Sequence, residues 1–392
     1  MSGLPFDHAI RNLGRRPLRT CLTALASALV AALLVATSSF VRGLERGFVD
    51  AADGDTAIVM SAASERDVVR SSISVQVPDL IAAGVSGIRQ AQGVAVISPE
   101  MHLATNLRLG KEAPLGEEDT HYPAFLRGIT PRAFLVHDVV TIMDGRPPRS
   151  GEVLVGRLVP ERMGVARDHF SVGSFVRFEG ATYTVSGVFA APGTTLESEI
   201  WTPANELRGQ TRRDDLNAIF VKMDSPDALD NLQLFARRRI DLELVVIPSS
   251  TYYRELSEYF DPIRRMAWAF ASLVALAAIA GGANTLNAAV QDRIRELATL
   301  LAIGHSGLAL AGSLAIEAIV IAAAGSLAGI ALAKVLLSGG VVRIAMGAFE
   351  LQIDAPSVLI GIGGTLLVAV LGSIPAGWRV MRLPVAYALK ET

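Results

Sequence analysis

The stretch Asn284-Thr-Leu-Asn-Ala-Ala-Val-Gln-Asp-Arg-Ile-Arg-Glu-Leu-Ala-Thr-Leu-Leu-Ala-Ile-Gly304 decides the architecture of this chain. It joins the end of a long uncharged segment to a short amphipathic one, and another apolar segment follows directly. One face of the short segment is apolar at i, i+3, i+4 and i+7 spacing, with the members Ile294, Leu297, Ala298 and Leu301. The opposite face mixes polar and apolar residues, namely Arg293, Glu296, Thr299, Leu300 and Ile303. We therefore predict a helix that packs on its own bundle with one face and presents the other face to a partner.

Two neighbouring residues fit this prediction. Gly304 ends the pattern as glycine commonly ends a helix, because it adopts the left-handed conformation without strain. Arg295 adds a second basic residue close to Arg293. A connecting helix that lies in the membrane interface and has no partner remains the alternative.

The chain has the composition of a membrane protein. Hydrophobic residues make up 51% of its 392 residues, and the mean hydropathy is +0.41. No charge occurs in Leu22–Val41, Met266–Val290 or Pro356–Trp378, and Leu308–Leu337 carries only Glu317 and Lys334. Each segment is long enough to cross a bilayer core, which takes about 20 helical residues. The predicted transmembrane helices are 20–42, 263–290, 308–337 and 356–378. The predicted fold class is a membrane α-helical protein of four spans, with a large α/β and β-rich domain, residues 43–262, inserted between the first and second helices.

The distribution of arginines predicts the orientation. Arginines cluster before the first span, between the second and third spans, and after the fourth, whereas the 338–355 loop carries only Arg343. The positive-inside rule therefore places residues 1–19, 291–307 and 379–392 in the cytoplasm, and the inserted domain and the 338–355 loop outside it. Four arginines on the outer flank argue weakly against this orientation: Arg42, Arg46, Arg264 and Arg265. A cleaved signal peptide over residues 11–41 is disfavoured, because the apolar run is long and no Ala-x-Ala site follows it.

The inserted domain is predicted to be mixed α/β. Strand–helix–strand patterns at 56–98 and 218–247 flank a β-rich part at about 120–205, where glycines separate short strands. The first pattern includes a helix expected over Pro78–Gln92. The single cysteine, Cys21, lies in the first span, so the domain contains no disulfide.

Two further helices are expected at the borders of the spans. Residues 5–16 have one apolar face and form a predicted amphipathic helix on the inner membrane surface, within the 1–19 segment. Tyr252–Arg265 is predicted to be a helix that continues into the second span despite Pro262. The first span is likewise expected to extend outward through Gly43–Phe48, so that the inserted domain stands on two helical stalks.

Several motifs in this order and spacing resemble one known family. They are Ile10-Arg-Asn-Leu-Gly-Arg-Arg-Pro-Leu-Arg-Thr-Cys-Leu-Thr23, Phe125-Leu-Arg-Gly-Ile-Thr-Pro131, Asp144-Gly-Arg146, Glu152-Val-Leu-Val-Gly156 and Tyr183-Thr-Val-Ser-Gly-Val-Phe189. Together with the 284–304 stretch and the membrane layout, they resemble FtsX/MacB/LolC-type ABC transporter permeases over nearly the whole chain. The resemblance implies a MacB-like periplasmic domain without a fused ATPase domain, and it makes the 291–307 helix the coupling helix that docks on an ATPase.

The resemblance also implies a function and partners. It implies that the chain is the permease subunit of an ABC transporter in a bacterial inner membrane, with both termini cytoplasmic. Such a transporter would drive export or extraction of a substrate from the membrane or periplasm. ATP and Mg would bind to a separate cytoplasmic ATPase and not to this chain. A second permease copy or a paralogue would complete the complex. A periplasmic membrane-fusion protein is a further candidate partner. The substrate stays open among lipoprotein, lipid, peptide and drug.

No sequence motif indicates an enzyme or a cofactor bound by this chain. The sequence lacks a Gly-x-x-x-x-Gly-Lys-Ser/Thr loop, and its six histidines lack metal-ligand spacing. Nucleic-acid binding has no support either, because no basic patch is interleaved with aromatic residues. The remaining alternative is a membrane-anchored sensor or scaffold, which the short segment after the fourth span disfavours.

Polar and small residues within the spans are the last candidates. Glu317 is a functional candidate, because placing a carboxylate within the membrane costs free energy. Of the two interpretations, a structural role near the coupling helix is favoured over a functional one. Asn284 is expected to hydrogen-bond between helices. Gly325, Gly329 and Gly372 are expected to allow close helix packing, within one chain or between two.

Overall fold

The computed structural model describes residues 17–49, 54–64, 67–110, 120–344 and 347–384. Contacts divide the chain into two compact units. The membrane unit comprises residues 1–42, 262–340 and 351–392, and the inserted unit comprises 43–261 and 341–350. The amphipathic helix predicted for residues 5–16 and most of the polar loop at 110–121 lie outside the described residues.

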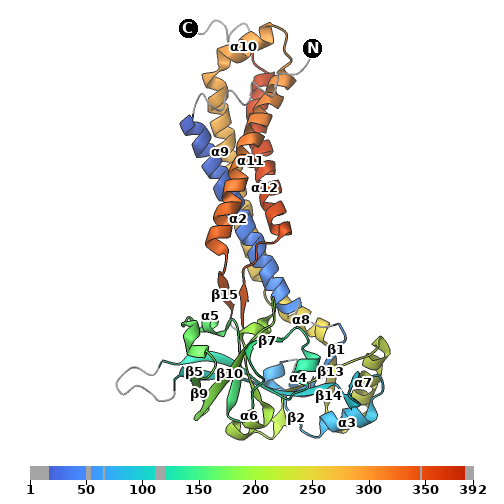
Figure 1. Cartoon of the computed structure of the whole chain (residues 1–392). Helices are drawn as coiled ribbons and strands as arrows, with labels where there is room; N and C mark the ends of the chain where they lie inside the picture. Colours follow the sequence, from blue (N-terminus) through green and yellow to red (C-terminus); the bar gives the residue numbers. More distant parts are fainter. Residues whose placement is uncertain (1–16, 50–53, 65–66, 111–119, 345–346, 385–392) are drawn as a thin grey trace. The chain divides into compact units, whose positions relative to one another are not determined.

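Among the described residues, four helices are long and apolar enough to cross a membrane, which confirms the predicted fold class (Figure 1). They are α2 (Pro17–Val49), α9 (Asp261–Asp292), α11 (Gly307–Leu337) and α12 (Ala355–Met381). The short helix α10 (Ile294–Ala302) lies between α9 and α11 in the chain. As expected, α2 continues beyond the length of a bilayer core into the inserted unit.

The prediction of one continuous helix over Tyr252–Arg265 is wrong. The structure has α8 (Ser249–Glu258) and then a new helix, α9, that begins at Asp261. Pro262 explains the break, because proline lacks a backbone N–H and its ring clashes with the carbonyl of the preceding turn. Proline is well tolerated in the first turn of a helix, which is the position it takes in α9.

In the described part of the inserted unit, ten strands form one sheet. They are β1 (Thr56–Ser61), β5 (Ile97–Leu109), β6 (Tyr122–Ile129), β7 (Thr141–Gly145), β8 (Glu152–Gly156), β9 (Phe175–Phe178), β10 (Ala181–Ala190), β11 (Ile200–Pro203), β13 (Ala218–Lys222) and β14 (Leu244–Pro248). The order β14-β1-β13-β5 makes an open antiparallel part. This part contains both of the predicted strand–helix–strand patterns.

The other part of the sheet closes on itself. From β5 the order continues through β6, β11, β8 and β10 to β9, and β9 pairs again with β5. The ring encloses a core to which every one of its strands contributes: Met101, Leu126, Ile200, Val155, Val185 and Val176. The 13-residue strand β5 is common to both parts, since Ile97–Glu100 pairs with β13 and Met101–Leu107 pairs with β6.

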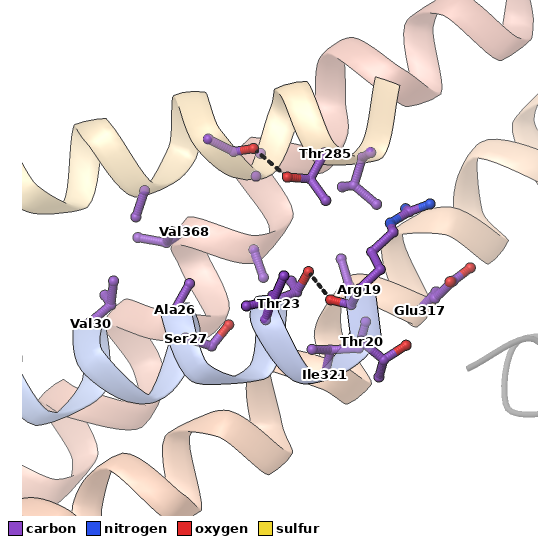
Figure 2. Close-up of a pocket in the computed structure, with 18 of the residues that line it drawn as sticks. Arg19, Thr20, Thr23, Ala26, Ser27, Val30, Thr285, Glu317, Ile321 and Val368 are labelled. Atoms are coloured by element: carbon purple, nitrogen blue, oxygen red, sulfur yellow. Dashed lines mark hydrogen bonds between the residues drawn. The ribbon is translucent and has the colours of Figure 1, made fainter. Parts of the chain in front are cut away.

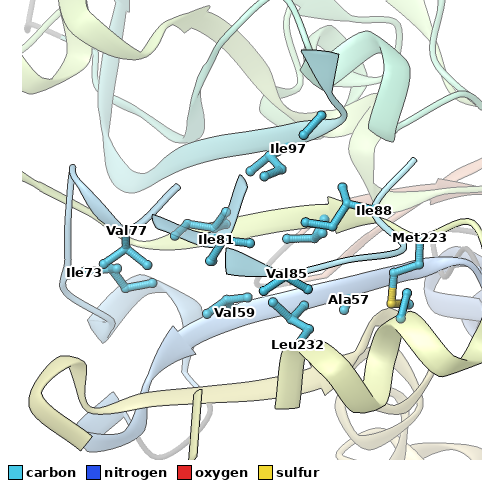
Figure 3. Packing of buried hydrophobic residues seen from close by; sticks show 14 of the residues in the cluster. Ala57, Val59, Ile73, Val77, Ile81, Val85, Ile88, Ile97, Met223 and Leu232 are labelled. Carbon is cyan, nitrogen blue, oxygen red and sulfur yellow. The ribbon is translucent and has the colours of Figure 1, made fainter. Parts of the chain in front are cut away.

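The open part of the sheet is covered on both faces. Alternate residues of β1 point to opposite sides, so Ala57 and Val59 enter one core while Ile58 and Met60 enter another. Helices α3 (Val77–Gly84) and α7 (Pro226–Arg238) cover the first core, which Figure 3 shows. Helix α4 (Ala133–Val136) and α8 contribute to the second. All residues of β1 except the last are therefore buried.

The predicted helix Pro78–Gln92 is too long. Helix α3 ends at Gly84, and Val85 is extended. Gly87 has φ +87°, and a Cβ atom at this position would lie 2.8 Å from the Cβ of Ala228 on α7. Two constraints at Gly87 are incompatible with a continued helix. The turn requires a left-handed backbone at this residue, and Ala228 on α7 occupies the space that a side chain would need.

Candidate functional site

Helix α10 has the boundaries of a short, well-terminated amphipathic helix. Arg293 precedes it with non-helical backbone angles, and Ile303 follows its last residue. Gly304 is left-handed with φ +103°, and the amide of His305 donates a hydrogen bond to the carbonyl of Leu300 over 3.1 Å. The sequence Ile303-Gly304-His305 therefore ends the helix and redirects the chain into α11.

One face of α10 is anchored in the membrane unit. Leu297 and Ala298 are buried, and Leu301 is partly buried in the same cluster. The cluster also contains residues from the three neighbouring spans α9, α11 and α12: Leu286, Val290, Leu310, Leu314, Ala318, Ala376 and Val380. The apolar stripe predicted from the sequence is thus the face that fixes α10 to the bundle.

The opposite face of α10 is exposed. Arg295, Glu296, Thr299 and Ile303 are exposed, and the exposed fraction of Ile303 is 68%. Leu300, predicted for this face, is instead half-buried and packs against the anchoring cluster. We call Arg295, Glu296, Thr299 and Ile303 the exposed α10 face.

Arg293 lies apart from the exposed α10 face. Its guanidinium pairs with the carboxylate of Glu317 on α11 at 3.5 Å, and the two side chains are only 12% and 10% exposed. Arg293, predicted to lie on the same face as Glu296, therefore points away from that face. The reason is that a carboxylate within a span needs a partner, and Arg293, just before the helix, points inward to provide one. Glu317 thereby links α11 to the start of α10.

The small residues of α11 and α12 pack against other spans of the same chain. A Cβ atom on Gly325 would lie 2.6 Å from the carbonyl oxygen of Ala24 on α2, and one on Gly329 would overlap the carbonyl oxygen of Ala28. Gly372 on α12 faces α9 in the same manner, with the carbonyl oxygen of Ile279 at 3.3 Å. Asn284, expected between helices, is exposed on α9.

A β-hairpin between α11 and α12 belongs to the inserted unit. It comprises β15 (Val341–Ile344) and β16 (Gly347–Glu350) within the predicted 338–355 loop. Phe349 is buried, and a Cβ atom on Gly43 would lie 2.8 Å from its ring. Glu350 accepts a hydrogen bond from Arg157 at 2.9 Å, and Arg157 also pairs with Glu197 at 3.1 Å. This hairpin could not be predicted from the sequence, because both strands are only four residues long.

A buried ionic cluster lies where the open part of the sheet meets the ring. Arg127 on β6 donates two hydrogen bonds to Glu199, at 2.7 and 2.8 Å, and one to Glu100 on β5 at 2.5 Å. Trp201 donates from Nε1 to Glu199 at 2.9 Å. Arg127 and Glu100 are 3% and 0% exposed, so the charges are satisfied by one another rather than by water.

Two histidines complete the buried ionic cluster around Glu100. The Nε2 atoms of His137 and His102 lie 2.8 and 3.4 Å from its carboxylate oxygens. Burial alone would raise the pKa of Glu100, but His137 and Arg127 beside it bring that pKa well below its ordinary value of 4.5. Burial, followed by the charge of Arg127, lowers the pKa of His102 below 6.5. Sequence spacing could not reveal this cluster, because Glu100 and His102 on β5 meet Arg127, His137 and Glu199 from later segments of the chain.

These shifts predict that acid destabilises the inserted unit. A folded state that disfavours protonation of His102 and Glu100 loses stability as the pH falls, first below 6.5 and then below 4.5. The melting temperature of the full chain should therefore decline from about pH 7 to pH 4, and His102→Gln should remove the first part of the decline. A melting temperature that is constant over this range would contradict the expectation.

Comparisons with known proteins agree with this layout. A family model described as the MacB-like periplasmic core domain matches residues 20–234, and one described as FtsX-like permease C-terminal matches residues 268–385. No curated protein matches the sequence.

Two solved structures are similar to about half of this chain. The crystal structure of the periplasmic region of MacB from Actinobacillus actinomycetemcomitans has 13% identity and a TM-score of 0.40, covering 53% of this chain and 95% of that one. The extracellular domain of the noncanonic ABC-type transporter YknZ from Gram-positive bacteria has 16% identity and a TM-score of 0.37, covering 49% of this chain and 99% of that one. With two family models that together span most of its length, the chain belongs to the MacB/FtsX-like family of ABC transporter permeases.

Proposed function

We propose that this membrane subunit is driven by a separate cytoplasmic ABC ATPase that docks on the exposed α10 face. The observation that carries the proposal is the division of α10 into an anchored face, with Leu297 and Ala298, and an exposed face ending in Ile303. An isoleucine that is 68% exposed beside charged residues is suited to an interface with an apolar centre and a polar rim. ATP and Mg bind to the partner in this proposal, because family permeases work with a cytoplasmic ABC ATPase.

The proposal includes an orientation and a location. The chain is a multi-pass protein of a bacterial inner membrane, with α10 and both termini in the cytoplasm and the inserted domain outside. The arginines near the ends of α2, α9 and α12 support this orientation, and Arg293 precedes α10 while Arg295 lies in its first turn.

A second permease copy or a paralogue is the proposed membrane partner. In the most apolar window of α9 only 6% of residues are buried, compared with 50% in α2. Residues of α9 such as Phe270 and Leu273 are about 60% exposed, which leaves a broad apolar face for a second subunit or lipid. A dimeric ATPase would need two α10 helices.

Movement of the inserted domain is the proposed output. Closure of the ATPase dimer would move α10 and the spans, and α2 and the hairpin β15–β16 would carry the movement into the inserted unit. Phe349 and the Arg157–Glu350 pair support this role for the hairpin, because they hold it against the inserted domain. The movement would export or extract a substrate from the membrane or periplasm, with a membrane-fusion protein as an additional candidate partner.

Ile303→Asp is expected to abolish binding of the ATPase while the permease still folds. A carboxylate placed in an apolar contact without a partner costs several kcal/mol, which is enough to break a moderate interface. The measurement is co-purification with the ABC ATPase encoded nearest to this chain's gene, together with stimulation of its ATPase activity.

Two variants control for other effects. Ile240→Asp makes the same change at an isoleucine of the inserted domain that is 81% exposed, and it should leave ATPase binding unchanged. Leu297→Asp should instead reduce the amount of folded permease, because Leu297 is buried in the bundle. Full ATPase binding and transport by Ile303→Asp would show that α10 is an interfacial linker.

A further inference from the structure

The ion pair Arg293–Glu317 connects the residue before α10 with the span α11, within the membrane unit. Glu317 lies in the first half of α11, and Arg293 immediately precedes Ile294, the first residue of α10. The charged groups are 3.5 Å apart, and their side chains are 12% and 10% exposed. Among the described residues, the structure gives neither side chain another ion pair or hydrogen bond. Each charge therefore has the other as its ionic partner.

Apolar packing alone does not fix how α10 is rotated about its axis. Leu297, Ala298 and Leu301 attach the middle and the end of this nine-residue helix to the bundle. Apolar contacts are non-directional, so a short helix held only by them is free to roll. The ion pair adds an attachment at the start of α10 that joins one guanidinium to one carboxylate. It thereby determines the direction in which the exposed α10 face points.

We propose that Arg293 and Glu317 are positioning residues through which movement of the docked α10 is passed to α11. The proposal rests on the proposed function, in which an ATPase docks on the exposed α10 face. Neither residue belongs to that face, so the pair is not needed for the ATPase to bind. It is needed for closure of the ATPase to move α11, because without it α10 rolls in place.

The surroundings of the pair explain why its loss should not unfold the permease. A cavity of about 560 Å³ adjoins both residues, and Figure 2 shows Glu317 among the residues that line it. Hydroxyl side chains from three helices contribute to the lining: Thr20, Thr23, Ser27, Thr285 and Thr365. A cavity of this size with polar partners suits water. A side chain that loses its ionic partner therefore keeps polar surroundings.

The experiment compares binding of the ATPase with its stimulation. Glu317→Gln and Arg293→Gln are each co-purified with the ABC ATPase encoded nearest to this chain's gene, and ATP hydrolysis by the complex is measured. We expect unchanged co-purification and a loss of stimulation of about fivefold or more, the range of coupling between distant sites. In the permease alone, the amides of α10 should exchange with deuterium faster than in wild type.

Two further variants separate charge pairing from a structural role of either side chain. Arg293→Lys keeps the charge, and it should retain stimulation because the structure shows a contact of charges without a hydrogen bond. The double variant Arg293→Gln/Glu317→Gln should lose no more stimulation than either single variant, since the two residues act as one unit.

A second ion pair of the membrane unit provides the matched control. Asp354 caps the start of α12 and pairs with Arg42 on α2 at 2.7 Å, whereas α10 packs near the other end of α12. Asp354→Asn makes the same acid-to-amide change and keeps the cap, because asparagine is an equally good capping residue. It should leave stimulation of the ATPase unchanged.

Three results would overturn the proposal: wild-type stimulation by Glu317→Gln, an equal loss in Asp354→Asn, or losses that multiply in the double variant. If Glu317→Gln does not fold, the comparison of Arg293→Gln with Arg293→Lys decides, and equal stimulation by these two would contradict charge pairing. A wild-type chain that binds no ATPase would refute the proposed function as well. If Ile303→Asp abolishes binding while Glu317→Gln keeps stimulation, only the positioning role fails.

Discussion

Arg127→Met is expected to lower the free energy of unfolding of the inserted unit by about 3–5 kcal/mol, a large part of the 5–15 kcal/mol typical of a protein domain. Methionine keeps much of the volume but leaves the carboxylates of Glu100 and Glu199 buried without their shared cation. Thermal unfolding of the full chain in detergent measures the effect. The fluorescence of Trp201 is a suitable signal, because its indole is buried and bonded to Glu199.

A second arginine–glutamate pair provides the control. Arg146 and Glu152 form an ion pair in the same unit, but their side chains are 44% and 20% exposed. Arg146→Met should leave the melting temperature nearly unchanged, since water replaces the lost partner. If the two variants unfolded at the same temperature, the buried ionic cluster would contribute no more than a surface pair.

Gly329→Leu is expected to produce the second large loss, in the membrane unit. Any side chain at this position overlaps the backbone of α2 at Ala28, and a backbone atom cannot rotate away as a side chain can. The two helices must separate, which also opens the contact at Gly325. We expect a loss of about 3 kcal/mol or more, seen as a severalfold fall in monodisperse protein after mild heating.

Gly312→Leu separates helix preference from packing. Gly312 lies on the same helix, and a Cβ atom there meets no atom within 4 Å. Leucine favours the helix over glycine equally at both sites, so the difference between the variants reports the contact with α2. Wild-type recovery of Gly329→Leu would mean that α2 and α11 are not in contact in the folded protein.

The four spans and α10 could be predicted from the sequence because their signals are local. A span needs about 20 apolar residues in succession, and the packed face of α10 repeats at helical spacing through Leu297, Ala298 and Leu301. Leu300 and Arg293 do not lie on the exposed face where the helical-wheel pattern predicted them. Leu300 lies at the edge of the packed face, and Arg293 lies before the helix begins, where the wheel does not apply.

The ring of strands, the hairpin and the buried ionic cluster depend on contacts between distant segments. Arg127 and Glu199 are 72 residues apart, and β5 pairs with both β6 and β9. No pattern within a short window records such pairings. The early end of α3 has a similar cause, because the close approach of Ala228 at Gly87 fixes it.

The shared strand β5 has a consequence for how the inserted unit opens. Its first residues, Ile97–Glu100, are hydrogen-bonded into the open part of the sheet, and the rest of the strand is bonded into the ring. Because one continuous strand belongs to both parts, we expect the two parts to unfold as one cooperative unit. The amides of β5 should then exchange with deuterium only through global unfolding, even though short peripheral strands such as β7 exchange through local opening.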